Sequence, residues 1–328
     1  MRITGTGKVL ATCLLVHLIC ILFIVSTGCQ EEVIFSDDNL EAVIRTEIGR
    51  PEGAIYSSDL KSITSLSAER CGITDLSGLE HCPNLKELTL FDNGISDISP
   101  IAGCRDLVYF NIDNNRVSDI SSLVDLENLR YVYLGDNRIT DVLPLAELIN
   151  LNILSLSHNR IEDISCLSGL EGLTQLYLSG NPIKSISTLY DFPDLEYLYL
   201  AENQIIDISP LSSLTSLTHL HLEDNRIVDI SPISNLISLE ALSIHGNKIK
   251  DISPLSGLTS LDYLMLYINE IEDITPLVEN QGLSDGDRLD LRGNPLNNLS
   301  VDKYIPDLRK RGVNVAWHDN TTSLPEFN

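Results

Sequence analysis

Three histidines and one glutamate have a spacing that could bind a transition metal. His219 and His221 are separated by a single residue, Glu223 stands at the next alternate position, and His245 lies further along the chain. Alternate residues of a strand face the same side, and imidazole nitrogens are common ligands of zinc. Glu223 is the one nearby carboxylate and no cysteine completes the set, so we predict no metal and no other cofactor. A metal held by the three histidines stays open as an alternative.

Tyrosines recur at alternate positions of short segments such as LEYLYLAEN, residues 195–203. Leucines stand between them, so if the leucines fill a core, the tyrosines face outward and are free of packing demands. Tyrosine combines a large, rigid contact area with a polar tip and is frequent in binding hot spots. The alternative is that aromatic residues merely suit exposed strand positions. The candidate ligand-binding residues are Tyr109, Tyr131, Tyr133, Tyr177, Tyr197, Tyr199, His219, His221, His245, Tyr263 and Tyr267.

Enzyme motifs are nearly absent. The segment Gly282–Gly286 fits the GxSxG pattern of hydrolases, but that nucleophile needs a helix after the serine, and here a strand is expected to follow. The aspartates Asp285, Asp287 and Asp290 have an incomplete spacing for a calcium site. The sequence contains no HExxH, Walker or EF-hand motif. We therefore predict a protein that is not an enzyme and has no catalytic residues.

An internal repeat of 22 residues positions these side chains. Each copy follows the pattern LxxLxLxxNxIxDISPLxxLxx, and its ninth position is asparagine except in the first copy, where it is Cys71. One copy cannot bury its apolar residues alone, so consecutive copies must stack around a shared core. Ten copies begin at Ile63, Leu85, Leu107, Leu129, Leu151, Leu173, Leu195, Leu217, Leu239 and Leu261, and a terminal copy begins at Gly286 after a three-residue insertion.

Each position of the repeat has a predicted role. Positions 4 and 6, such as Leu198 and Leu200, alternate with exposed residues as in a short strand. The asparagine at position 9 is expected to bond backbone groups at a bend, and stacked copies would form a ladder of such bonds. Position 13 is aspartate in nine of ten copies and Ser185 in the other, which is typical of a cap that accepts backbone N–H bonds. A calcium-binding stripe of carboxylates is the alternative.

This pattern resembles the leucine-rich repeats of the 22-residue, internalin-like class found in bacterial surface proteins. The resemblance extends from Ile63 to Leu299. It implies an α/β-type solenoid, a horseshoe with a parallel sheet on its concave face and 3₁₀ or extended segments on its convex side. Proteins of this class bind other proteins, including host receptors, so the resemblance implies a binding protein whose concave face contacts the partner. The fold alone does not identify that partner.

Caps are expected at both ends, because an open solenoid exposes its core there. Residues Asp37–Ile48 have helical spacing, and Ser300 could cap a second helix that ends at Gly312, followed by an edge strand at Val313–Trp317. The expected division of the chain is residues 1–28 for a signal peptide, 29–62 for a tether and helical N-terminal cap, 63–299 for the repeats with the insertion at 280–285, 300–318 for a C-terminal cap, and 319–328 for a disordered tail.

The first 28 residues resemble a bacterial lipoprotein signal peptide. Arg2 and Lys8 precede the apolar run Val9–Val25, and the small residues 26–28 stand directly before Cys29. Cleavage before Cys29 would expose it for lipidation, which predicts an exported protein anchored by lipid to the outer face of a bacterial membrane in the cell envelope. An uncleaved membrane anchor and an ordinary secretory signal are the alternatives.

The net charge of the chain argues against some classes of partner. Acidic residues outnumber basic residues 47 to 22, and the formal net charge is −25. Nucleic acid and an anionic membrane surface would repel this chain, so we predict no nucleic-acid partner and membrane contact through the lipid at Cys29. We expect a monomer that binds a protein. A glycan or cell-wall polymer as the ligand, and a structural spacer without a specific ligand, are the alternatives.

The cysteines outside the predicted signal and lipidation site are Cys71, Cys82, Cys104 and Cys166, and none forms a CxxC pair. Cys82 and Cys104 both stand at position 20 of adjacent copies, where stacking brings like positions within reach of a disulfide. Either the two residues form that bond or each replaces a core leucine.

Overall fold

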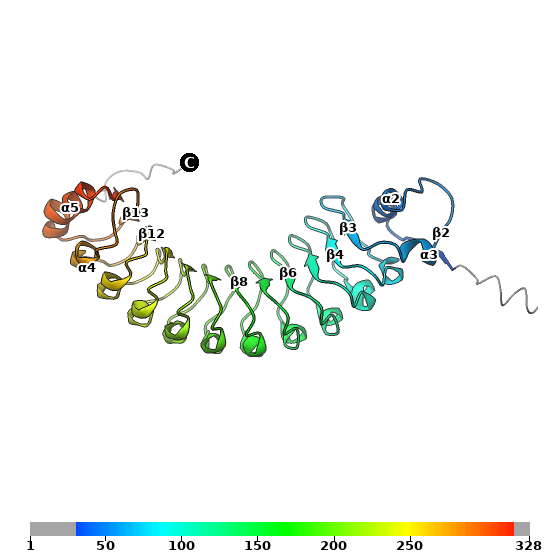
Figure 1. Ribbon diagram of the computed structural model, residues 1–328, viewed down its shortest axis with the longest axis horizontal. Helices are drawn as coiled ribbons and strands as arrows, with labels where there is room; N and C mark the ends of the chain where they lie inside the picture. The colour runs from blue at the N-terminus through cyan, green and yellow to red at the C-terminus, as the bar shows by residue number, and fades with distance from the viewer. Residues whose placement is uncertain (1–30, 318–328) are drawn as a thin grey trace, which may run out of the picture.

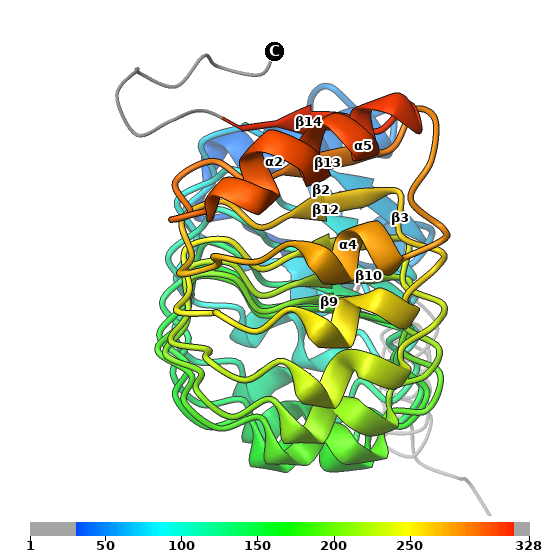
Figure 2. The same ribbon diagram turned by 90° about the vertical axis from the view of Figure 1, so that its left-hand side faces the viewer.

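Residues 31–317 are described by a computed structural model, in which the chain coils into a curved solenoid (Figure 1). A parallel sheet of twelve strands lines the concave side, in the order β14-β13-β12-β11-β10-β9-β8-β7-β6-β5-β4-β3. Short 3₁₀ helices line the convex side, and the view in Figure 2 shows the coils stacked on one another. The predicted fold class is therefore confirmed. Within residues 31–317, no helix has the length and apolar character that a membrane span requires.

The elements repeat once per coil. The strands of the sheet are β3 (Ser65–Ser67), β4 (Glu87–Thr89), β5 (Tyr109–Asn111), β6 (Tyr131–Tyr133), β7 (Ile153–Ser155), β8 (Gln175–Tyr177), β9 (Tyr197–Tyr199), β10 (His219–His221), β11 (Ala241–Ser243), β12 (Tyr263–Met265), β13 (Arg288–Asp290) and β14 (Asn314–Ala316). The convex helices are η1 (Leu79–His81), η2 (Ser99–Gly103), η3 (Ser121–Leu123), η4 (Leu143–Leu145), η5 (Ser165–Gly169), η6 (Ser187–Asp191), η7 (Ser209–Ser213), η8 (Ser231–Asn235), η9 (Ser253–Gly257) and α4 (Thr275–Glu279). The ends contain β1 (Glu32–Val33), α2 (Asp38–Glu47), β2 (Ile55–Tyr56), α3 (Ser57–Leu60), η10 (Ser300–Tyr304) and α5 (Ile305–Lys310).

Neighbouring strands pair so that like positions of the repeat lie side by side. Leu198 of β9 pairs with Leu176 of β8 and with Leu220 of β10. Successive side chains of a strand point to opposite faces, so the leucines enter the core and the residues between them face the concave side. Leu198 and Leu200 are 0% exposed, as is Ile205 in the same coil. The regular register therefore turns each repeat position into a column of stacked side chains.

The asparagine at position 9 satisfies the backbone at the bend that follows each strand. The amide of Asn203 donates to the carbonyls of Leu178 and Leu200, and its Oδ1 accepts the N–H of Ile183. Leu178 and Ile183 belong to the preceding coil, so each asparagine joins two coils. The predicted ladder is confirmed.

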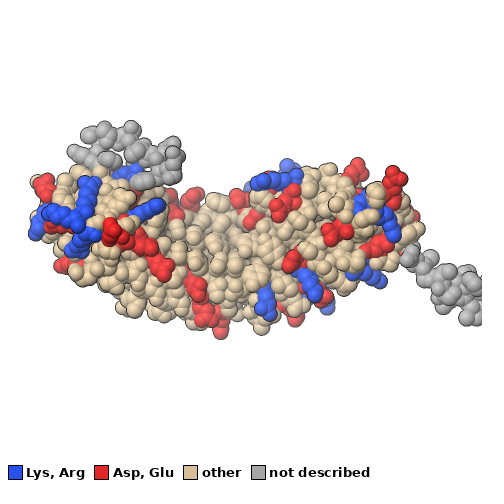
Figure 3. All heavy atoms as spheres, turned by 45° about the horizontal axis from the view of Figure 1, so that its top comes forward, with Lys and Arg blue, Asp and Glu red and all other residues tan. Residues whose placement is uncertain are grey.

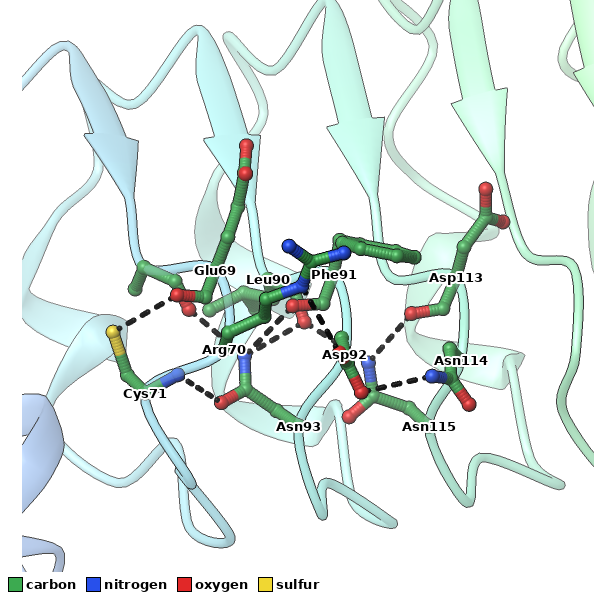
Figure 4. Close-up of polar contacts among 11 residues, drawn as sticks. Glu69, Arg70, Cys71, Leu90, Phe91, Asp92, Asn93, Asp113, Asn114 and Asn115 are labelled. Atoms are coloured by element: carbon green, nitrogen blue, oxygen red, sulfur yellow. Dashed lines mark hydrogen bonds and ion pairs between the residues drawn. The ribbon is translucent and has the colours of Figure 1, made fainter.

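Figure 4 shows the first rungs of this ladder. Asn93 Oδ1 accepts the N–H groups of Cys71 and Ile73, and its amide donates to the carbonyl of Leu90. Cys71 stands in the asparagine position of the first coil, and its Sγ donates to the carbonyl of Glu69 at 3.3 Å. No repeat coil precedes this one, so a side chain that joins two coils is not required there.

The aspartate at position 13 caps the turn on the convex side. Asp207 Oδ1 accepts the N–H of Ser209 at 2.8 Å, and nine coils contain this bond at 2.8 or 2.9 Å. Ser185 makes a longer contact of 3.5 Å with the N–H of Ser187. Since the carboxylates are bonded to their own backbone, the capping role is confirmed, and the geometry gives no support to a calcium stripe.

Cys82 and Cys104 are free thiols rather than a disulfide. Both are buried, and Cys104 Sγ lies 3.5 Å from the carbonyl oxygen of Cys82. Burial raises the pKa of Cys82 to about 12 and that of Cys104 to about 11, so both thiols stay protonated at neutral pH. Each fills the place of a core leucine.

Helix α2 lies over the N-terminal end of the sheet (Figure 1), in the region where the sequence predicts a helix. Asp37 caps it by accepting the N–H of Leu40, and its second carboxylate oxygen accepts the N–H of Thr74 in the first coil at 2.8 Å. Leu40 and Ile44 are 0% exposed. One aspartate therefore both starts the helix and fastens it to the repeats.

The C-terminal end differs from the prediction at Ser300, which does not cap its own helix. The hydroxyl of this buried serine donates to the carbonyl of Glu272 and accepts the N–H of Ile274, both in the preceding coil. The side chain of Asn297 accepts the N–H of Ser300 instead. Stacking of the helical segment on the preceding coil thus turned the hydroxyl away from its own backbone.

Candidate binding surface

Three columns of side chains run along the concave face, at repeat positions 3, 5 and 7, and we call them column 3, column 5 and column 7. The strand pairing from β5 to β14 keeps each column continuous. The structure brings all of the candidate residues onto this face. Column 3 contains Tyr109, Tyr131, Tyr197, His219 and Tyr263, column 5 contains Tyr133, Tyr177, Tyr199 and His221, and column 7 contains His245 and Tyr267.

Aromatic rings stack along these columns. In column 5, the ring centroids of Tyr177 and Tyr199 are 4.8 Å apart, and those of Tyr199 and His221 are 4.3 Å apart with an interplanar angle of 8°. In column 3, Tyr197 stacks on His219 at 4.5 Å. The expectation that these rings are free of packing demands is therefore wrong, because the strand spacing of about 4.8 Å places neighbouring rings in contact. The result is a rigid platform of partly buried rings.

A second aromatic group lies nearer the N-terminus. The ring of Tyr109 is 6.4 Å from that of Tyr131 and 5.5 Å from that of Tyr133, with tilted planes. Strand β7 places Ile153 and Ser155 between this group and the stack that begins at β8. The face therefore presents two aromatic groups separated by one coil of smaller side chains.

The tyrosine hydroxyls keep their protons. Burial raises the pKa of Tyr133, Tyr177 and Tyr199 above the ordinary tyrosine value. Each hydroxyl can therefore donate a hydrogen bond at neutral pH, as Tyr177 does to Gln175 Oε1 at 2.8 Å. A partner laid on this face would meet flat apolar rings with polar edges.

The histidines bond to different neighbours and do not converge on one point. His221 Nδ1 lies 3.2 Å from Glu223 Oε1, and His219 Nδ1 lies 2.9 Å from Thr218 Oγ1. His245 Nε2 lies 2.7 Å from the hydroxyl of Tyr267. Among residues 31–317, no group of three His, Cys, Asp or Glu side chains is arranged to hold a metal ion. The geometry gives no support to the metal alternative.

A cavity of about 410 Å³ lies at the C-terminal end of the concave face, over strands β10 to β14. His245 and Tyr267 line it together with Arg288, Asp290 and Arg292. The sequence analysis did not place the last three residues on this face. They occupy positions 3, 5 and 7 of the terminal copy, so counting back from its asparagine across the insertion would have found them.

One wall of the cavity is a buried ion pair. Arg292 Nε donates to Asp290 Oδ1 at 2.9 Å, and Asp290 is 2% exposed. The carboxylate of Asp290 raises the pKa of Arg292, whose guanidinium lies 5.9 Å from the ring centroid of Tyr267. The pair is therefore neutral as a unit and is held against an aromatic ring.

Two of the three concave columns contain no acidic residue, lysine or arginine over most of the sheet although the chain is strongly acidic. Columns 3 and 5 contain no Asp, Glu, Lys or Arg from β5 to β12. Figure 3 agrees, because the part of the concave side that it shows between the two ends is largely tan, with red and blue side chains around it. Charged residues depleted from a patch and aromatic residues enriched in it are the composition of an interface core.

The hydrolase-like segment has a packing explanation. It joins α4 to β13, so a strand rather than a helix follows Ser284. A Cβ atom at Gly282 would lie 2.0 Å from the carbonyl oxygen of Thr259, so the close approach of two coils requires glycine there. Cys29, the predicted signal peptide and the predicted tail lie outside the described residues.

Comparison with known proteins agrees with this architecture. The family described as leucine rich repeats (2 copies) matches residues 61–103, 105–147, 149–191, 193–235 and 237–279. None of the curated proteins compared with the chain matches it.

Several solved structures are similar to this chain. An internalin, InlF, from Listeria monocytogenes is 29% identical, with a TM-score of 0.75, and the match covers 90% of this chain and 95% of that one. Internalin C2 from the same species is 32% identical, with a TM-score of 0.57, covering 73% and 98%. The ectodomain of the membrane receptor kinase GASSHO1/SCHENGEN3 from Arabidopsis thaliana, in complex with Casparian strip integrity factor 2, is 22% identical, with a TM-score of 0.61, covering 70% and 29%, and shares the fold. With family matches over more than half of its length, the chain belongs to the leucine-rich repeat family.

Proposed function

We propose that this protein is an extracytoplasmic binding protein, anchored to a bacterial membrane by lipid at Cys29, that holds a protein partner on its concave face. The leucine-rich repeat solenoid is typical of domains for protein–protein interaction, and the plant receptor ectodomain with this fold was crystallised in complex with Casparian strip integrity factor 2. The observation that carries the proposal is the pair of uncharged aromatic columns in a chain of net charge −25. We propose binding without catalysis, by a monomer with the domain division predicted from the sequence.

The stacked rings favour tight binding for a physical reason. Tyr177, Tyr199 and His221 already contact one another, so they lose little conformational freedom when a partner covers them. The exposed edges of the three rings supply apolar area, and the protonated hydroxyls of Tyr177 and Tyr199 supply hydrogen-bond donors. A partner that covers columns 3 and 5 between β5 and β12 also avoids the desolvation of carboxylate, lysine and arginine side chains.

The test is a crosslinking pull-down from the native envelope. A variant with Tyr131, Tyr133, Tyr197 and Tyr199 replaced by serine should lose the captured partner, with at least a tenfold fall in affinity, because hot-spot residues carry most of the binding free energy. Tyr190→Ser is the matched control, since Tyr190 is 49% exposed and lies on η6 of the convex side. If the quadruple variant folds and captures the same partner as before, the concave face is not the binding site.

A glycan ligand would use the same rings, so it is a second outcome of the experiment. Sugar rings also stack on tyrosine, and a glycan array run beside the pull-down separates the two ligand classes. If the protein binds a glycan on the array, the quadruple variant does not, and the pull-down captures no protein, then the ligand is a glycan rather than a protein.

The lipid anchor has its own test. Cys29→Ala should move the protein from the membrane fraction to the soluble fraction and abolish incorporation of a labelled fatty acid, because the acyl chains supply the membrane affinity. Retention of the label in this variant would exclude Cys29 as the modified residue.

A further inference from the structure

The cavity at the C-terminal end of the concave face is a trough between taller side chains. Strand β11 pairs with β10 on one side and with β12 on the other, so the small residue Ser243 lies between His221 and Met265 in column 5. Ser243 is 4% exposed and lines the cavity with both of these neighbours. A side chain of a partner can therefore enter more deeply here than on the stacked rings.

Glu223 lines the β10 end of this cavity with one carboxylate oxygen unpaired. Its Oε1 lies 3.2 Å from His221 Nδ1, whereas its Oε2 is buried and has no hydrogen-bond partner among residues 31–317. Ser122 Oγ is the only other buried side-chain oxygen or nitrogen of these residues without a partner. The second carboxylate of the cavity is different, because both oxygens of Asp290 accept bonds from Arg292. Glu223 therefore keeps an acceptor for which this chain supplies no donor.

The carboxyl of Glu223 is ionised at neutral pH although it is largely buried. Burial raises its pKa, but the hydrogen bond and charge of His221 and the nearby Ser243 hydroxyl outweigh burial and hold the pKa below the ordinary glutamate value. The Ser243 hydroxyl thus lies near enough to act on the carboxyl without satisfying Oε2. A buried carboxylate oxygen that has lost its water and has no donor is costly, and a ligand that supplies a donor removes that cost.

The surroundings of Glu223 on the concave face contain an excess of carboxylates. In the coils of β9, β10 and β11, positions 3 to 8 of the repeat contain no lysine or arginine, and position 8 adds Glu202 and Asp224. The arginines of the cavity, Arg288 and Arg292, belong to the coil of β13, which is three strands away from β10. The β10 end of the cavity is therefore negative, and it attracts a cation rather than an anion.

We propose that the β10 end of this cavity binds a basic side chain of the partner polypeptide, with Glu223 as its counter-ion. The terminal torsion of glutamate is broad, so a turn of the carboxylate about that bond presents Oε2 to a donor in the cavity. An ammonium or guanidinium group supplies the donor that this oxygen lacks. Tyr263 and Met265 on the opposite wall offer apolar surface to the stem of a long basic side chain. This inference rests on the proposed function, since the cavity continues the face to which the partner is assigned.

The test uses short peptides rather than the unidentified partner. Dye-labelled pentapeptides with blocked ends, each with one Lys or Arg among uncharged residues, are titrated with the purified protein, and fluorescence anisotropy is measured. Each peptide is compared with its neutral counterpart, in which acetyl-lysine replaces Lys or citrulline replaces Arg. The basic peptide should bind at least roughly tenfold more tightly, the effect of one charge-assisted hydrogen bond. Glu223→Gln should abolish that difference, because the amide keeps the shape of the side chain and removes its charge.

Glu171→Gln is the matched control, because Glu171 is exposed, lies outside the concave columns and carries the same charge. It should leave the preference for the basic peptide unchanged, which separates the site from the general attraction of an acidic chain for cations. Ser243→Lys is a second variant that keeps Glu223 and places an ammonium of the protein itself in the trough. It should also abolish the preference, and circular dichroism checks that each variant is folded.

The proposal is overturned if no basic peptide binds, or if a basic peptide and its neutral counterpart bind equally. It is also overturned if the preference survives in Glu223→Gln or in Ser243→Lys, or if Glu171→Gln abolishes it. Glucosamine oligosaccharides that bind while basic peptides do not would assign the cavity to another class of cation and would likewise overturn it.

The envelope pull-down separates this inference from the proposed function. If the quadruple tyrosine variant keeps the partner while Glu223→Gln loses the preference for basic peptides, the aromatic assignment fails and the cation site stands. If the quadruple variant loses the partner while the unchanged protein binds basic and neutral peptides equally, the proposed function stands and this inference fails.

Discussion

The convex and concave sides of this solenoid are built from the same repeat, but they vary in opposite ways. On the convex side, nine coils place an aspartate oxygen at 2.8 or 2.9 Å from the same backbone N–H. On the concave side, column 5 changes from Tyr199 to His221, Ser243, Met265 and Asp290 within five coils. Repetition marks positions where the backbone needs one particular side chain, and variation marks positions where it does not.

The stacked rings show that a variable position of the repeat can still contribute to packing. Tyr199 contacts both Tyr177 and His221, so a position that varies between coils still contributes to packing within this protein. The two sides therefore differ in what fixes the residue: the backbone of the coil on the convex side, and the neighbouring side chain on the concave side.

The largest effect on stability is expected inside the coil, between the two sides. Asn203→Ala removes bonds to three carbonyls, those of Leu178, Leu200 and Ala201, and to the N–H of Ile183 in the preceding coil. Leaving such groups unpaired costs roughly 3 kcal/mol or more. Urea unfolding measures this loss of the free energy of unfolding. A loss smaller than that of Tyr199→Ala, described next, would refute the role of the ladder.

A concave substitution should have an intermediate effect. Tyr199→Ala removes two ring contacts, at 4.8 and 4.3 Å, and should destabilise the protein by roughly 1–2 kcal/mol. The double-mutant cycle with His221→Ala should give a coupling free energy of about 0.5 kcal/mol or more. Additive effects in that cycle would mean that the rings pack independently, as the sequence analysis assumed.

The convex side should become more uniform and slightly more stable with Ser185→Asp. The contact of Ser185 with the N–H of Ser187 is 3.5 Å, whereas aspartate makes it at 2.8 Å in the next coil. The expected gain is a few tenths of a kcal/mol, on the order of a better cap, and it should increase with salt as repulsion from neighbouring aspartates is screened. A loss of melting temperature at high salt would show that serine is required in this coil.

Acid should affect the two sides in separate pH ranges. Burial lowers the pKa of His245 below 6.5, so the unfolded chain binds a proton that the folded chain does not, and stability falls as the pH drops below about 6.5. The N–H of Ser209 lowers the pKa of Asp207 below 3.8, so that contribution is present above 3.8 and is lost as the pH falls further.

Melting temperature measured against pH checks this difference. His245→Gln should flatten the profile between about pH 5 and 6.5 and leave the steeper fall below pH 4 unchanged. An unchanged profile between pH 5 and 6.5 would assign that slope to another group.

The sequence predicts the fold well because each position of the repeat occurs in many copies, which show the residue type that it requires. Leu198, Asn203 and Asp207 have roles that follow from one coil and the requirement to stack. The site is less predictable, since the stacking of Tyr199 on His221 depends on the spacing between coils and on ring orientation. Arg288 was missed because the insertion shifts the count of repeat positions, and the prediction for Ser300 was wrong because its hydroxyl bonds the preceding coil.

The asparagine ladder also bears on how such a protein can evolve. Each asparagine bonds its own coil and the one before it, so duplication or deletion of 22 residues restores every bond of the ladder at the new junction. Such a change adds or removes one strand of the concave face and keeps the ladder intact. The three-residue insertion lies between α4 and β13, just before the terminal coil, and Asn294 still bonds the carbonyl of Leu266 and the N–H of Ile271 in the preceding coil. The ladder is therefore compatible with an added loop between a convex helix and the next strand as well as with a whole added coil.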